Sequence, residues 1–347
     1  MSVLKNLKAD KILRSRLAFL ILGVVIGIVG VSILNSKTLI PQNSNNNVSQ
    51  NPSVSAAYNE FSELHLGQYK LIDPLYECNT GLPYGNTQLL NLRDTINDYI
   101  NTLTANNSVT RVAVQFRDLN SGPWFGINNQ DQFSASSLAK VPVMMAYYKE
   151  AESDPSILTK GIAYTQDPAG LTVQDYTTKY PLEKGKTYTV EQLIEHMIIN
   201  SDNVALLLLE NNISNDKINQ VTLDLGIATT NDLSLSVQDY ATILRVLYYS
   251  TYLSKDYSEQ VLEMMSKAEF TQGLVALLPK NITIAHKFGE RSLSDGTNQL
   301  HDCGIVYYPK HPYLICIMTK GPNFDDLATT IQQISDKIYN EYLKMYP

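Results

Sequence analysis

Cysteine and histidine are scarce in this 347-residue chain, with 3 and 5 copies respectively. Three cysteines are too few, and odd in number, to form the disulfide framework of a small secreted scaffold. No spacing of cysteine or histidine suggests a metal site, so we expect neither a metal nor another cofactor. Cys303 and Cys316 lie on consecutive strand-like segments, where they are either bridged or simply small buried residues. We interpret the neighbouring His301 and Asp302 as structural rather than catalytic.

Positive charge is also in short supply. The 27 Lys and Arg residues are outnumbered by 34 Asp and Glu residues, which gives a formal net charge of -7. This balance argues against nucleic acid as a partner, because binding the phosphate backbone requires a basic surface. The chain is long enough to bury the core of one large domain or of two modest ones.

Charged residues are absent from residues 17–34, an apolar run just long enough to cross a membrane as a helix. Lys37 alone follows the run closely, whereas five basic residues precede it: Lys5, Lys8, Lys11, Arg14 and Arg16. The positive-inside rule therefore places the N-terminus in the cytoplasm and the rest of the chain outside. A cleaved signal peptide is the alternative, but the run is long for one and lacks a convincing cleavage site. We predict a single-pass anchor in the cell membrane.

Composition divides the chain into five segments. Residues 1–16 form a basic cytoplasmic segment and residues 17–34 the transmembrane anchor. Residues 35–56, rich in Asn, Ser and Gln, cannot bury a core and are typical of a flexible linker. Residues 57–85 contain enough apolar side chains to pack on a domain as an ordered leader, and residues 86–347 form the main domain.

Hydrophobic periodicity predicts the fold of that domain. Helical spacing marks residues 92–103 near its start and residues 327–342 at its end, and the middle, 137–268, is almost entirely helical by period. Two strand-like segments follow the first helix and two precede the last: 109–119, 123–127, 304–308 and 313–319. We therefore predict an α+β domain after the transmembrane helix. Its antiparallel sheet is formed by both ends of the domain and flanked by helices, with a mostly helical inserted region.

A serine and a lysine one helical turn apart begin the central helical region. Ser137 is followed by Lys140 at a spacing that puts both side chains on one helix face. A serine at a helix start is ordinarily an N-cap. It is also well placed to be a nucleophile, because free backbone N–H groups and the positive end of the helix dipole favour an oxyanion there. Lys140 could act as the base only if burial or a neighbouring cation lowers its pKa.

A polar trio interrupts two strongly apolar helical segments at Ser201, Asp202 and Asn203. Such a string is a common turn or cap, but buried polar side chains need partners or a cleft. In the functional interpretation, Ser201 relays a proton, Asn203 binds a substrate amide and Asp202 holds the loop in place.

A third short motif contains Lys287 and Gly289 on a strand predicted to lie at an edge. An exposed strand lysine beside a glycine bulge is the ordinary explanation. In the functional interpretation, Lys287 holds a substrate carboxylate and Gly289 lets substrate backbone approach closely. The backbone N–H of Glu290 would then be a second donor to the oxyanion, after that of the nucleophile.

Taken together, Ser137-x-x-Lys140, Ser201-Asp-Asn203 and Lys287-x-Gly289 resemble the penicillin-recognising serine hydrolases, specifically the class A β-lactamases. The resemblance covers about residues 86–345. It implies an acyl-enzyme formed on Ser137 from a small β-lactam or a D-alanyl peptide, by a protein that we expect to be a monomer.

The chain departs from this family pattern at two places. Phe288 stands where a hydroxyl residue usually helps to bind the substrate carboxylate, and Arg291 is a candidate to replace that hydroxyl. The family also carries a loop glutamate that activates the deacylating water. Here only residues 227–235 connect two predicted helices, and their sole carboxylate is Asp232, a weak candidate for that base.

Three functions stay open on the sequence alone. The first is a serine hydrolase of the β-lactamase type that hydrolyses its acyl-enzyme. The second is a D,D-peptidase-like or penicillin-binding protein that acts on cell-wall peptides and deacylates slowly. The third is a catalytically silent binding domain displayed on the membrane.

Overall fold

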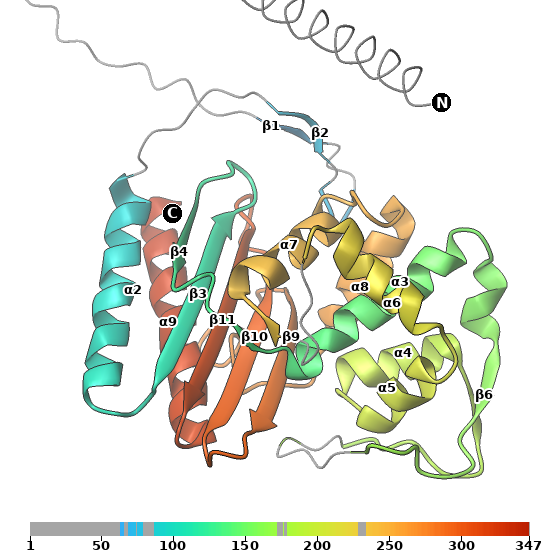
Figure 1. Cartoon of the computed structure of the whole chain (residues 1–347). Coiled ribbons are helices and arrows are strands. Elements are labelled where there is room, and N and C mark those ends of the chain that lie inside the picture. The colour runs from blue at the N-terminus through green and yellow to red at the C-terminus, as the bar shows by residue number, and fades with distance from the viewer. Residues whose placement is uncertain are drawn as a thin grey trace, which may run out of the picture. The chain divides into compact units, whose positions relative to one another are not determined.

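Five antiparallel strands form the central sheet in the order β4-β3-β11-β10-β9. The computed structural model describes residues 63–65, 69–73, 75–78, 87–171, 176, 179–227 and 234–346. All of them belong to the compact unit Tyr58–Pro347. The strands of the sheet are β3 (Arg111–Asp118), β4 (Trp124–Ile127), β9 (Ile284–Ser292), β10 (Asn298–Val306) and β11 (Tyr313–Gly321). The sheet thus joins the two ends of the domain, and the α+β prediction is confirmed (Figure 1).

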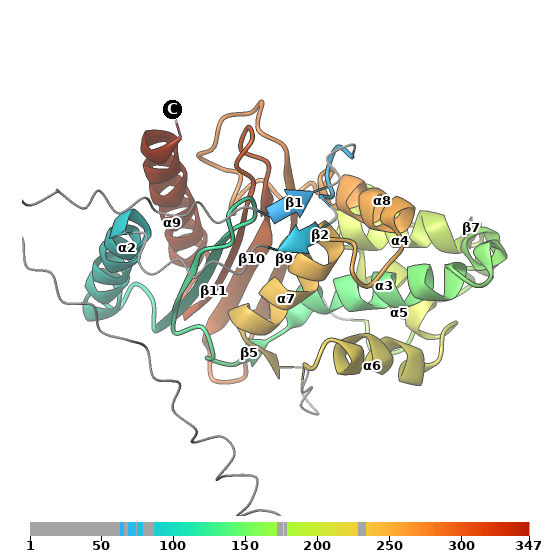
Figure 2. The same ribbon diagram turned by 90° about the horizontal axis from the view of Figure 1, so that it is seen from above.

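Helices α2 (Thr87–Ala105) and α9 (Phe324–Met345) cover one face of the sheet (Figure 2). Their apolar stripes, among them Ile96 and Ile334, are buried: α2 contacts β4, and α9 contacts β10 and β11. The side chains between this face and the two helices form the first of two hydrophobic cores. Amphipathic periodicity therefore predicted both terminal helices correctly.

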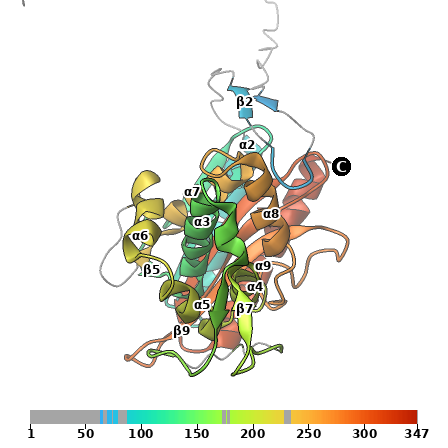
Figure 3. The same ribbon diagram turned by 90° about the vertical axis from the view of Figure 1, so that its right-hand side faces the viewer.

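The opposite face carries the helical region, which builds the second core (Figure 3). Helix α7 (Val237–Tyr248) contacts β3 and β11, and α8 (Lys255–Met265) contacts β9. The other described helical elements precede α7 along the chain: η1 (Ser136–Ala139), α3 (Lys140–Ala151), η2 (Pro155–Thr159), α4 (Val190–Ile199), α5 (Asn203–Glu210) and α6 (Asn215–Asp224).

The helical region is less purely helical than predicted. Two short ribbons interrupt it or border it: β5 (Phe133–Ser134) with β8 (Ser234–Leu235), and β6 (Gly161–Ala163) with β7 (Thr187–Thr189). Strands of two or three residues are too short to show a period of two. This is why the helical spacing of their neighbours concealed them.

The C-terminal hairpin is confirmed, but its first strand starts earlier than predicted. Strand β10 begins at Asn298 rather than at residue 304. The polar residues His301 and Asp302 concealed this start, because charged and polar side chains rarely face a core. Both are fully buried here and bonded: His301 Nε2 lies 3.1 Å from the Ser134 carbonyl, and Asp302 accepts from Leu274 N–H at 2.9 Å.

The N-terminal predictions lie mostly outside the described residues, including the whole of residues 17–34. No helix in the described part of the chain is long and apolar enough to span a membrane. Within the predicted leader, β1 (Glu63–His65) pairs with β2 (Leu75–Cys78). Leu71 and Ile72 are buried in the domain core, and their N–H groups donate to the Glu259 carboxylate.

Candidate active site

The predicted nucleophile lies in a tight turn before helix α3. Ser137 belongs to η1, and α3 begins at Lys140, so the expectation that Ser137 opens the helix itself is wrong by one turn. Neither η1 nor α3 has a side-chain N-cap, and Ser137 is only 8 % exposed. Ser136 just before it has a φ of 48°, a strained conformation for a residue other than glycine. The late start of α3 also explains Pro142, which falls in the first turn, where an N–H is dispensable.

The amine of Lys140 is the centre of a buried hydrogen-bond network. It lies 2.9 Å from Ser137 Oγ and 2.8 Å from Asn203 Oδ1. It also contacts Ser201 twice, at 2.6 Å from the carbonyl oxygen and 3.1 Å from Oγ. Lys140 is completely buried. Within the described residues these hydrogen bonds all go to uncharged oxygens, so dipoles rather than a carboxylate solvate the Lys140 amine.

Burial lowers the pKa of Lys140 to about 7. The negative charges of Asp202, Glu290 and Glu210 oppose this shift but do not overcome it. A lysine whose pKa lies near neutrality can exist as the neutral amine that a general base must be.

The loop between α4 and α5 supplies the next group. Asp202 caps α5 by accepting from the N–H groups of Val204 and Ala205, which confirms that it holds the loop in place. Ser201 has a φ of 56° and is fully buried. The cap and the strained backbone together fix the Ser201 hydroxyl beside Lys140.

Lys287 reaches the same hydroxyl from strand β9. Its Nζ lies 2.9 Å from Ser201 Oγ, so Ser201 bridges the two amines. Burial lowers the pKa of Lys287 well below its usual value, and the charge of Lys140 lowers it further. We call Lys140 and Lys287 the lysine pair. The predicted convergence of Ser137, Lys140, Ser201 and Lys287 is confirmed.

Gly289 marks the closest approach of strand β9 to the nucleophile turn. A Cβ added there would lie 3.2 Å from the backbone nitrogens of Ser137 and Leu138 and 3.3 Å from the Ala135 carbonyl oxygen. An alanine would therefore be tight against the backbone of this turn, which would have to shift by a few tenths of an ångström. Strand β9 is the edge strand of the sheet, as predicted.

Comparison with known proteins agrees with the arrangement of these residues. The sequence model of the Beta-lactamase enzyme family matches residues 91–342, which lie within the predicted main domain. The chain belongs to this β-lactamase enzyme family. It is a serine hydrolase of the β-lactamase type.

Individual relatives of this β-lactamase family member are distant in sequence. β-Lactamase VEB-1 of Pseudomonas aeruginosa is 28% identical over 286 residues, which cover 76% of this chain and 91% of that protein. A β-lactamase structure from Chitinophaga pinensis superimposes with a TM-score of 0.64 at 21% identity, covering 73% of this chain and 99% of the other. The structure of PBP-A gives a TM-score of 0.60 at 24% identity, covering 74% and 97% respectively. The structural matches show the shared fold.

Two residues proposed for substrate binding lie beside the site with side chains already engaged. Glu290 accepts a hydrogen bond from the backbone N–H of Tyr176 at 2.9 Å. Arg291 donates to Ser134 Oγ at 2.7 Å, on strand β5 just before the nucleophile turn. Their predicted roles in binding substrate remain predictions.

Phe288 makes contacts that its place in the sequence did not predict. Phe288 is 5 % exposed, and its ring stacks on that of Phe270 with centroids 4.0 Å apart. The Lys287 amine lies 4.4 Å from the ring centroid, and the carbonyl of Phe288 accepts a hydrogen bond from it. Aromatic faces attract cations. Phe288 thus stabilises the ammonium form of Lys287, a contact that a hydroxyl residue could not make.

Among the described residues, the hydrogen-bond network around Lys140 contains no candidate for the base that would activate the deacylating water. Asp232, the weak candidate, lies outside the described residues. Glu210, which the sequence analysis did not select, lines a small cavity together with Ala135 and Ala139, the residues that flank the nucleophile turn. Burial raises its pKa, while Lys140 opposes the shift. No group of three or more metal-ligating side chains occurs in the described part of the chain.

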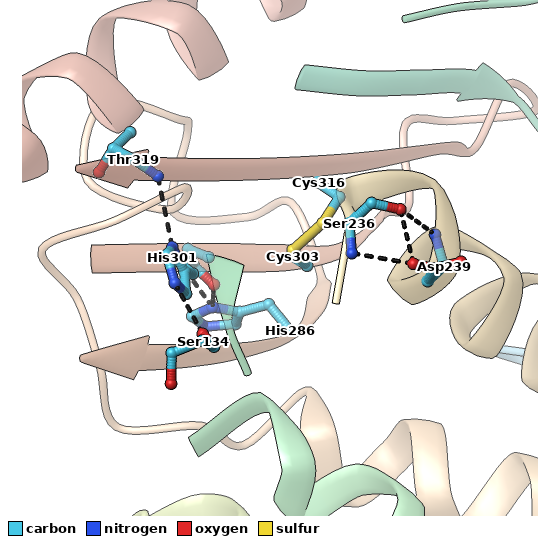
Figure 4. Close-up of a disulfide and its surroundings, with 9 residues drawn as sticks. Ser134, Ser236, Asp239, His286, His301, Cys303, Cys316 and Thr319 are labelled. Carbon is cyan, nitrogen blue, oxygen red and sulfur yellow. Dashed lines mark hydrogen bonds and ion pairs between the residues drawn. A yellow bond between two sulfur atoms is a disulfide. The ribbon is translucent and has the colours of Figure 1, made fainter. Parts of the chain in front are cut away.

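A disulfide links two neighbouring strands of the sheet, β10 and β11 (Figure 4). It joins Cys303 and Cys316, which decides the alternative left open by the sequence. The two cysteines are directly opposite each other on β10 and β11, and Cys303 is also the register partner of Lys287. The buried His286 and Asp302 side chains, 2.9 Å apart, further connect β9 with β10.

Proposed function

We propose that this β-lactamase family member is acylated on Ser137 by β-lactams and then hydrolyses the acyl-enzyme. The observation that carries the proposal is the hydrogen-bond chain from Ser137 through Lys140 and Ser201 to Lys287. It contains an activated nucleophile, a base of suitable pKa and a proton relay, which acyl transfer requires.

The reaction begins when neutral Lys140 takes the proton of Ser137 Oγ. The oxygen attacks the lactam carbonyl, and a tetrahedral oxyanion forms near the backbone N–H of Ser137, with that of Glu290 as the proposed second donor. As the C–N bond breaks, Ser201 gives its proton to the leaving nitrogen. Ser201 recovers a proton from Lys140, so the base returns to its neutral form.

Lys287 binds the substrate and does not take part in the proton transfers. Its amine lies beside Ser201, where it would attract the carboxylate of a β-lactam, with Arg291 as a second cation. Water must then attack the ester, and this step needs its own base.

A D,D-peptidase-like function with slow deacylation is the second candidate. The observation in its favour is that residues 227–235 contain no glutamate. A mutant of PBP-A, whose structure is 24% identical in sequence, has been solved as an acyl-enzyme complex with penicillin G.

We further propose that residues 17–34 anchor the protein in the cell membrane and that the main domain lies outside the cytoplasm. The disulfide between Cys303 and Cys316 supports this location, because disulfides persist in oxidising compartments. Fractionation of cells that express the full chain, or a chain lacking residues 17–34, tests the anchor. Only the full chain should sediment with membranes.

The enzymatic proposal is tested with a chromogenic cephalosporin and a fluorescent penicillin. Wild-type protein should turn over the cephalosporin, and Ser137→Ala should not. Ser136→Ala is the matched control, since the Ser136 hydroxyl has only a 3.5 Å contact to the Ser134 carbonyl. Stoichiometric labelling without turnover would favour the peptidase-like function. No labelling at all would favour a silent binding domain.

A further inference from the structure

A second cationic site lies on the sheet away from the serine. A cavity of about 200 Å³ opens between strands β3, β4 and β11 and helix α7. Trp124, Arg117 and Leu314 form one row across the three strands, since Arg117 is the register partner of both other residues. Gln238 and Arg245 face this row from α7, two helical turns apart on one helix face.

The cavity concentrates positive charge without a counter-charge. Arg117 and Arg245 both line it, and no carboxylate is among its lining residues. Neither arginine forms a hydrogen bond or an ion pair with any side chain or carbonyl in the described part of the chain, and Arg117 Nε is buried. Burial lowers the pKa of Arg245, and Arg117 lowers it further. A guanidinium does not give up its proton in proteins, so this repulsion persists until an anion enters.

The rest of the lining is arranged to donate. Asn129 Nδ2 donates to the side-chain oxygens of Gln115 and Gln238, at 3.2 and 3.1 Å. The acceptor end of each glutamine is therefore occupied. Their NH₂ groups donate to no residue within the described ranges, which leaves them to a ligand. Trp124, 55% exposed, adds a flat apolar wall at one side.

We propose that this cavity, the arginine cavity, binds a phosphate group carried by a small organic molecule. Two guanidinium groups match the double negative charge of a phosphate monoester, and Arg recognises phosphate through paired N–H donors. The volume suits a phosphate group better than a drug-sized ligand, which needs about 300 Å³ or more. Trp124 would stack on the organic part. This site is independent of the chemistry proposed for Ser137.

The test is isothermal titration of the full-length protein in neutral detergent at low salt, with inorganic phosphate and with phenyl phosphate. Both should bind, phenyl phosphate more tightly. Each of Arg117→Gln and Arg245→Gln should weaken binding by about tenfold to a hundredfold, the usual value of a charge-assisted hydrogen bond. Arg93→Gln is the matched control, because Arg93 is exposed and already paired with Asp94. Trp124→Ala should abolish the preference for phenyl phosphate only.

Two results would overturn the proposal. The first is wild-type protein that binds neither compound at millimolar concentration. The second is binding that Arg117→Gln and Arg245→Gln leave unchanged. Circular dichroism and thermal melting verify that each variant is folded. Equal affinity for the two compounds, lost in both arginine variants, would identify free phosphate as the ligand and contradict the organic part of the proposal.

Discussion

The domain contains two pairs of neighbouring cations, the lysine pair and the pair formed by Arg117 and Arg245, and their surroundings differ. The lysine pair is buried among hydroxyl, amide and carbonyl oxygens, and burial lowers both pKa values. Arg117 and Arg245 donate no side-chain hydrogen bond within the described residues, and a guanidinium group cannot lose its charge. The difference teaches that a lysine pair can relieve its repulsion by releasing a proton, which is useful for catalysis. An arginine pair can relieve it only by binding an anion.

Removal of the Lys140 amine should have the largest effect of any substitution in the two pairs. We expect Lys140→Ala to slow acylation by about 10²–10⁴-fold, the usual contribution of a general base. The measurement is the rate of fluorescent penicillin labelling under single-turnover conditions. Lys149→Ala, on the exposed side of the same helix, is the control and should label at the wild-type rate. A Lys140→Ala variant that labels normally would move the role of base to another group.

Lys287→Ala should have a smaller effect, because this amine touches Ser201 and not Ser137. Loss of one charged hydrogen bond to substrate corresponds to about a tenfold to hundredfold fall in kcat/KM. Most of the fall should appear in KM for a β-lactam that bears a carboxylate. An unchanged KM would contradict the role of Lys287 in binding that carboxylate.

The acylation rate should depend on pH through the protonation of Lys140, whereas the two arginines stay charged. With the pKa of Lys140 at about 7, its neutral fraction and the acylation rate should rise about tenfold between pH 6 and pH 8. The sign follows because only the unprotonated amine can accept the proton of Ser137. Stopped-flow labelling across this range provides the measurement. A rate that falls with rising pH would show that the protonated form is the active one.

Arg245→Gln should have the smallest effect, and it should stabilise the protein, whereas most substitutions that remove an interaction destabilise it. Removing one of two like charges relieves repulsion, so in phosphate-free buffer Tm should rise by about 1–3 °C. Differential scanning calorimetry would detect this change, with Arg93→Gln as the reference variant. A marked fall in Tm would mean that Arg245 stabilises the fold by packing.

Local motifs made much of the site predictable. Ser137 and Lys140 are one turn apart, and Asp202 caps its helix with its own side chain, so their spacing alone places them. Lys287 could be added because the family resemblance joins motifs that are distant in sequence. The terminal helices were predictable from their 3.6-residue period.

Other features depend on strand register and had no local signal. The pairing of Cys303 with Cys316 and the row of Trp124, Arg117 and Leu314 exist only once β3, β4, β10 and β11 are aligned. The contact between Lys287 and the Phe288 ring was missed because an aromatic residue was judged only as the loss of a hydroxyl. Strand β10 was cut short because its buried polar residues find their partners in distant segments.

The central claim is that Ser137, activated by Lys140, forms a covalent acyl-enzyme. Intact-protein mass spectrometry after exposure to penicillin, followed over time, tests it most directly. The account predicts a gain equal to the whole mass of the lactam, because the ring opens without losing a fragment. The adduct should map to Ser137, be absent from Ser137→Ala and decay as the ester hydrolyses. A wild-type protein whose mass never changes, and which leaves the penicillin intact, would contradict the account.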